Sequence, residues 1–110
     1  MLLQVTLLGP PVILGTEEAQ LGSLGETVMV HCHAQSSPDL TNILWTFGGE
    51  ELRRQGGGDI SIVESRTGTR IKSTVIIKNA QKEHFGQYLC AVENELGRTE
   101  AAIQLEELGK

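Results

Sequence analysis

Apolar and polar residues alternate with a period of two along most of the chain. Successive side chains of a β-strand point to opposite faces, so this alternation predicts short strands with one buried face. Glycine-rich turn signals, such as Gly48-Gly49 and Thr67-Gly68, separate the strands, and only 79–85 suits a short helical turn. Strands of this length and spacing indicate an antiparallel sandwich or barrel. The apolar sets are Val28, Val30 and Cys32; Ile43, Trp45 and Phe47; Ile60 and Ile62; Val75 and Ile77; Tyr88, Cys90 and Val92; and Ile103 and Leu105.

Four residues on these strands narrow the fold. Cys32 and Cys90 fall at inward positions, Trp45 lies inward on the strand after the first cysteine, and Tyr88 stands two residues before the second. This arrangement is typical of an immunoglobulin sandwich, in which a disulfide joins the sheets, the indole packs on it, and the tyrosine hydroxyl fixes a corner. We predict an all-β, immunoglobulin-like Greek-key sandwich of two antiparallel sheets with an inter-sheet Cys32–Cys90 disulfide. Trp45 and Tyr88 are its predicted core.

Several longer motifs resemble those of a known protein family. The chain resembles I-set immunoglobulin domains, and its segments 81–88 and 94–105 are similar to the last domain of IgLON and lachesin-like neural adhesion proteins. The residues that carry the resemblance are Pro10-Pro11-Val12-Ile13; Gly25-Glu26-Thr27-Val28, Val30 and Cys32; Trp45; Val75 and Ile77; Gly86-Gln87-Tyr88, Cys90, Val92 and Asn94; and Gly97.

The resemblance implies a role in protein recognition. It predicts an extracellular adhesion module of a multi-domain, membrane-anchored cell-surface protein, which acts as a recognition surface or as a spacer. Its partners would be other proteins, including another immunoglobulin domain, bound homophilically or heterophilically. Two alternatives stay open: an ectodomain module of a signalling receptor, and an intracellular sarcomeric spacer domain. In the sarcomeric case the cysteines would be free thiols, because the cytosol keeps most cysteines reduced.

One residue departs from the family pattern. His84 stands where the family has an aspartate that supports the corner around Tyr88. A histidine can take this place only as a donor or, when neutral, as an acceptor. We expect either His84 or its neighbour Glu83 to support the corner.

The same resemblance suggests domain boundaries. The domain is predicted to cover 10–107. Residues 1–9 would be a linker or the tail of a preceding immunoglobulin domain, and 108–110 would be a linker or an arbitrary end. A signal peptide is not expected at the start, because no positively charged region precedes the apolar residues and Pro10-Pro11 stands where a cleavage site would lie.

Composition and charge exclude some partners. The 110 residues carry 9 Lys and Arg against 14 Asp and Glu, a net charge of −5. This balance argues against nucleic acid and against an anionic membrane surface, which both need a surplus of positive charge. Aromatic residues make up only 4% of the chain, so a base-stacking platform is not expected either.

Catalytic and metal-binding patterns are weak. Glu17-Glu18, Glu50-Glu51 and Glu106-Glu107 are sequence neighbours, which point to opposite faces of a strand and cannot converge on a substrate. His31 and His33 share an outer face but point away from the cysteines, and 56–58 lacks the lysine and serine of a phosphate loop. We predict no enzyme activity, no cofactor, no metal and no small-molecule substrate.

The outward positions of one sheet supply a candidate interaction face. Four of its six residues are apolar, although this side of the sheet should meet solvent, and contiguous exposed apolar area marks protein-binding sites. The alternative is an ordinary surface, because single apolar residues on exposed strands are common. The six residues are Leu44, Thr46, Leu89, Ala91, Ala102 and Gln104.

Overall fold

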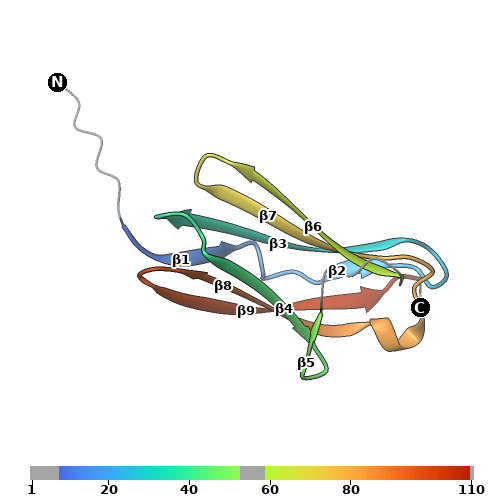
Figure 1. Ribbon diagram of the computed structural model, residues 1–110. Coiled ribbons are helices and arrows are strands. Elements are labelled where there is room, and N and C mark those ends of the chain that lie inside the picture. The colour runs from blue at the N-terminus through green and yellow to red at the C-terminus, as the bar shows by residue number, and fades with distance from the viewer. Residues whose placement is uncertain (1–7, 53–58, 110) are drawn as a thin grey trace.

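The computed structural model describes residues 8–52 and 59–109, which form two packed β-sheets (Figure 1). The four-stranded sheet has the order β1-β3-β7-β6 and the five-stranded sheet has the order β2-β9-β8-β4-β5. This arrangement confirms the predicted immunoglobulin-like sandwich. In chain order the elements are β1 (Gly9–Leu14), β2 (Gln20–Gly22), β3 (Val28–Ser37), β4 (Asn42–Phe47), β5 (Glu50–Leu52), β6 (Ile60–Thr67), β7 (Arg70–Ile77), the 3-10 helix η1 (Lys82–His84), β8 (Gly86–Asn94) and β9 (Gly97–Glu107).

The predicted antiparallel pairing holds in the described strand pairs with one exception, since β2 runs parallel to β9. The chain crosses from the first sheet to the second after β1 and keeps its direction, which is also that of β9 (Figure 1). Gly15 lies at this crossing with a φ of 68°, a conformation that favours glycine. The Gln20 side chain then binds back to β3, donating to the His31 carbonyl at 2.9 Å and accepting from the His31 N–H at 2.8 Å.

Two short strands, β2 and β5, carry no readable alternation because each has only three residues. Strand β5 is instead specified by its turn. Gly48 and Gly49 connect the paired residues Phe47 and Glu50 and both have positive φ, at 62° and 82°. A two-residue hairpin turn of this kind needs positive φ at both positions, which glycine adopts without strain.

The core is built around the predicted disulfide, which the structure contains between Cys32 and Cys90 with 6.5 Å between the Cα atoms. Trp45 pairs with Cys90 on the adjacent strand and is only 1% exposed. The Tyr88 ring contacts Trp45 edge-on at 6.4 Å and stacks on Phe47 at 4.2 Å between centroids. Both core predictions, Trp45 and Tyr88, therefore lie where the parity of their strands places them.

His84 supports the corner around Tyr88. The Tyr88 hydroxyl donates to the His84 carbonyl at 2.6 Å, and the Gln81 N–H donates to His84 Nδ1 at 2.9 Å. The histidine therefore takes the aspartate's place as an acceptor, while Glu83 is exposed. Burial raises the pKa of Tyr88 to about 12, because the ionised phenolate would be poorly solvated there.

Asn94 fixes the end of the sandwich where the chain enters. Its Nδ2 donates to the Gly9 carbonyl at 2.8 Å and to Ser36 Oγ at 3.0 Å, while its Oδ1 accepts from the N–H groups of Leu96 and Gly97 at 2.8 and 3.1 Å. One side chain therefore joins β1, β3 and the β8–β9 turn.

Parts of the predicted organisation lie outside the described residues. These are 1–7 of the proposed linker, the turn at 56–58 and Lys110. Within the described part, Gly9 already belongs to β1 and β9 ends at Glu107.

Candidate protein-binding face

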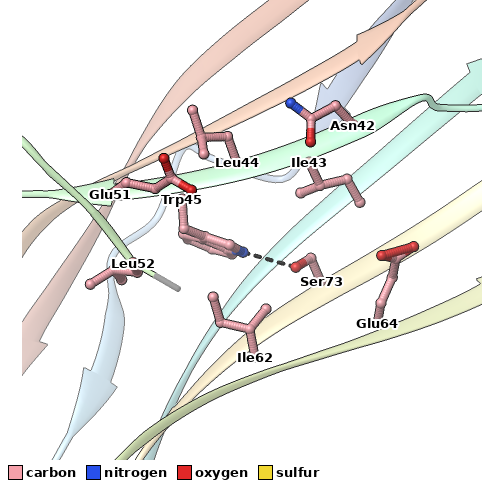
Figure 2. Close-up of a pocket in the computed structure, with 9 residues that line it drawn as sticks. All are labelled: Asn42, Ile43, Leu44, Trp45, Glu51, Leu52, Ile62, Glu64 and Ser73. Carbon is pink, nitrogen blue, oxygen red and sulfur yellow. Dashed lines mark hydrogen bonds between the residues drawn. The ribbon is translucent and has the colours of Figure 1, made fainter. Parts of the chain in front are cut away.

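The outer face of the five-stranded sheet is the reverse side of the core strands. Strand β4 buries Trp45, so its neighbour Leu44 must project the other way. Figure 2 shows this directly, with Leu44 on the opposite side of β4 from Trp45. On β8, Leu89 alternates in the same way with the buried residues Tyr88 and Cys90.

The strand register brings the six predicted residues together. Leu44 on β4 lies beside Ala91 on β8, and Thr46 lies beside Leu89. Leu89 in turn lies beside Ala102 on β9. Gln104 is the next outward residue along β9. The residues therefore form one continuous patch over three neighbouring strands.

Exposure within this patch is uneven. Ala102 and Gln104 are exposed, and Leu44 and Leu89 are partly exposed. Ala91 is only 6% exposed, although it points outward, because its short side chain lies low among the residues of the neighbouring strands. The expectation that Ala91 is open to solvent is therefore wrong, and the apolar centre is formed by Leu44 and Leu89.

Four carboxylates that we did not assign to this face surround the apolar centre. Strand parity could have identified the three on β8 and β9, since they alternate with inward residues as Leu89 and Ala102 do, whereas the fourth lies on the short strand β5. Arg98 is the cation among the outward positions of the described strands in this sheet, and it pairs with Glu100 at 3.3 Å. Both side chains of this pair are about half exposed, so the pair contributes little to stability. The four carboxylates belong to Glu51, Glu93, Glu100 and Glu106.

A pocket of about 380 Å³ opens between the two sheets next to β4 (Figure 2). Trp45 and Ile62 lie on its wall, and the Trp45 indole N–H donates to Ser73 Oγ at 2.8 Å. Its described lining includes Glu51, Glu64 and Ser73 but no histidine, cysteine or lysine.

The two strand histidines lie on the outer face of the other sheet. The rings of His31 and His33 are 6.0 Å apart, and His31 Nδ1 is 2.9 Å from Thr74 Oγ1. Burial lowers the pKa of His31, and the nearby charges of Lys72 and His33 lower it further. The described residues hold no group of three or more histidine, cysteine, aspartate or glutamate side chains that could bind a metal ion. Among the same residues, no helix is long and apolar enough to cross a membrane.

The disulfide, the tryptophan packed on it and the tyrosine corner define the class of the protein as a disulfide-linked sandwich domain. The family description "Immunoglobulin domain" matches residues 10–94, and the chain belongs to this family. The predicted resemblance to immunoglobulin adhesion proteins is thereby confirmed.

Similar proteins carry a matching domain within longer chains of their own. It is 39% identical over 102 residues to the Irregular chiasm C-roughest protein of Drosophila melanogaster, covering 93% of this chain and 13% of that protein. It is 27% identical over 101 residues to IgLON family member 5 of Mus musculus, covering 92% of this chain and 28% of that protein. The chain thus spans well under a third of either relative.

Solved structures agree on the fold. A chain in the crystal structure of Dpr2 Ig1-Ig2 in complex with DIP-Theta Ig1-Ig3 matches with a TM-score of 0.77 at 22% identity. The match covers 90% of this chain and 32% of that chain. At this level of identity the likeness establishes the shared sandwich.

Proposed function

We propose that the chain is an extracellular protein-binding module of a multi-domain cell-surface adhesion protein, without enzyme activity. The observation that carries the proposal is the 39% identity to the Irregular chiasm C-roughest protein over nearly the whole domain. Neural cell adhesion molecule 1 of Homo sapiens is a second relative, at 27% identity. The Cys32–Cys90 disulfide supports an oxidising compartment, because disulfides rarely persist in the cytosol.

The recognition surface in this proposal is the outer face of the five-stranded sheet. Leu44 and Leu89 supply apolar area that gains about 25 cal/mol for each Å² removed from water. Exposed Ala102 allows a partner to approach closely on the β9 side. Parent-chain anchoring in a membrane and homophilic or heterophilic pairing belong to the same proposal. The second candidate, a module of a signalling receptor, would use the same face.

Replacing Leu89 with arginine tests the surface without touching the core. The variant Leu89→Arg places a charge in the centre of the patch, whereas Leu24→Arg makes the same change in a loop outside it. Leu24 is 38% exposed, so it is a matched apolar site. Cells that display the full-length parent protein would be tested for adhesion, and the thermal midpoint of each domain variant would be measured in parallel.

The proposal expects Leu89→Arg to weaken adhesion at least about tenfold, equivalent to about 1.4 kcal/mol. Leu24→Arg should leave adhesion unchanged, and both variants should keep their thermal midpoints. Unaltered adhesion with folded Leu89→Arg protein would refute the surface and leave a spacer role. Free thiols at Cys32 and Cys90 in protein isolated from its native compartment, measured by non-reducing peptide mass spectrometry, would refute the extracellular assignment and favour the sarcomeric alternative.

A further inference from the structure

The two outer faces of the sandwich carry opposite charge. The outward positions of the five-stranded sheet hold four carboxylates and one arginine, as described above. The four strands of the other sheet contain a single carboxylate, Glu64, which faces the sheet's inner side and pairs with Arg66 at 2.8 Å. The outward positions of that sheet therefore bear no carboxylate, and those of β7 include Arg70 and Lys72.

The positive residues of this second face are neighbours in the strand register. Lys72 on β7 pairs with His33 on β3, and Arg70 pairs with Gln35 one step along. On the other side of β7 they pair with Ser65 and Thr67, whose hydroxyl groups can also donate. Lys72, Arg70, His33, Ser65 and Thr67 line a hollow of about 240 Å³. Glu18 is a carboxylate near this face, because it lines a neighbouring hollow together with His31 and His33.

Both faces combine their charges with exposed apolar side chains. The acidic face has Leu44 and Leu89 at its centre. The basic face has Val63 and Met29, which are 49% and 47% exposed. Protein interfaces commonly have an apolar centre within a charged rim, and complementary charges then set orientation. In charge and in apolar content the two faces therefore complement each other.

We infer that the domain associates with a second copy of itself face to back, the acidic face of one copy on the basic face of the next. This inference rests on the proposed function, because it names the partner of the same surface. A symmetric contact of the acidic face with itself would bring Glu93 and Glu100 against carboxylates of the second copy, and like charges placed against each other disfavour association. The basic face excludes self-pairing in the same way.

The face-to-back contact is heterologous, so it leaves one acidic and one basic face free at the ends of any stack. Contacts of this kind grow into open arrays unless the rotation between copies closes a ring. Each pair of exposed charges contributes little, so a single contact is weak and sensitive to salt. Weak repeated contacts of this kind would cluster copies that a membrane already concentrates.

Charge reversal with mixing tests the contact. One variant carries Glu93→Lys and Glu100→Lys, which makes both of its faces positive. The other carries Arg70→Glu and Lys72→Glu, which makes both negative. Sedimentation velocity of each protein, alone and in an equal mixture, would be run up to about 1 mM protein in about 50 and 500 mM NaCl. Glu26→Lys with Glu83→Lys, two exposed positions outside the strands, controls for net charge.

We expect the unmodified chain to associate in a concentration-dependent way in low salt and at least about tenfold more weakly in high salt. Each reversed variant alone should be monomeric, and the equal mixture of the two should associate. The net-charge control, Glu26→Lys with Glu83→Lys, should associate in both salt conditions no more weakly than the unmodified chain. The neutral variants Glu93→Gln with Glu100→Gln and Arg70→Gln with Lys72→Gln should weaken association without rescue on mixing. These neutral variants keep the test decisive if a charge reversal prevents folding.

Three results would overturn the inference. They are a monomeric unmodified chain at all concentrations in low salt, association that neither reversal changes, and failure of the mixture to associate when both variants are folded. Heparin serves as a probe for a different use of the basic face, and heparin binding by an otherwise monomeric chain would assign that face to a polyanion. If the chain is monomeric while Leu89→Arg still abolishes cell adhesion, the proposed function stands and only the face-to-back contact fails.

Discussion

Ser73→Ala isolates one hydrogen bond on which the core depends. Trp45 is 1% exposed and Ser73 is 2% exposed, and the indole N–H donates to the hydroxyl at 2.8 Å. The substitution removes a single oxygen atom and leaves the indole donor without its partner. A buried donor that loses its partner costs about 1–3 kcal/mol. The inter-sheet pocket that both residues line gives water a route to the indole, so we expect the lower half, about 1–2 kcal/mol.

Urea unfolding followed by far-UV circular dichroism measures this loss. The signal must not depend on tryptophan fluorescence, because the chain has only one tryptophan and a companion variant removes it. Ser61→Ala, an exposed serine on β6, is the matched control and should change the free energy of unfolding by less than about 0.5 kcal/mol.

A double-mutant cycle with Trp45→Phe separates the hydrogen bond from packing. In the Trp45→Phe background the indole donor is absent, so Ser73→Ala no longer leaves a buried N–H unpaired. The coupling between the two sites should therefore be at least about 1 kcal/mol. Equal cost of Ser73→Ala in both backgrounds, or a cost no larger than that of Ser61→Ala, would refute the reasoning and assign the buried serine to strand packing alone.

Three further measurements test the core and its titration. Replacing Cys32 and Cys90 together by alanine should cost about 4 kcal/mol in urea unfolding, because the disulfide joins residues 58 apart; unchanged stability would contradict this. Absorbance titration should show the single Tyr88 ionising near 12 rather than 10.0, and since its pKa is raised in the folded state, stability should fall as pH rises above 10.0. The pKa of His31 is lowered in the folded state, so the unfolded chain binds the proton more tightly and stability should fall as pH drops below 6.5. His31→Gln should reduce that loss, and a pH profile of the variant identical to that of the unmodified chain would contradict the assignment to His31.

Strand parity made the core and the outer face predictable from the sequence. A period of two assigns each side chain to one of two sides, so placing Trp45, Tyr88 and the cysteines inside also places Leu44 and Leu89 outside. Parity carries no information on which strands are lateral neighbours. The low exposure of Ala91 depends on its neighbours Leu44 and Glu100, and this register appears only in the folded sheet.

The alternation of apolar and polar residues does not predict polar contacts between segments that are distant in the sequence. Ser73 follows Lys72 in an unremarkable polar stretch, yet its hydroxyl accepts from an indole 28 residues away. Asn94 was visible only as part of a family motif, whereas its side chain joins Gly9 and Ser36 to the β8–β9 turn. The parallel pairing of β2 with β9 likewise depends on the chain crossing from one sheet to the other, and the hydrophobic periodicity does not predict this crossing.

Each strand contributes inward residues to the core and outward residues to a binding face. Because these residues occupy positions of opposite parity, the binding face can be altered without changing the core. Lys72 is exposed next to the buried Ser73, and Glu100 on β9 is exposed beside its partner Ala91 on β8. Changing either charge alters an outer face while the inward residues and the disulfide stay in place. Ala91 is the exception, since it points outward but is enclosed, so enlarging it would disturb the sheet and the face together. Substitutions at Leu89, Lys72 and Glu100 therefore report on binding, whereas a loss of binding at Ala91 could not be separated from a local change in packing.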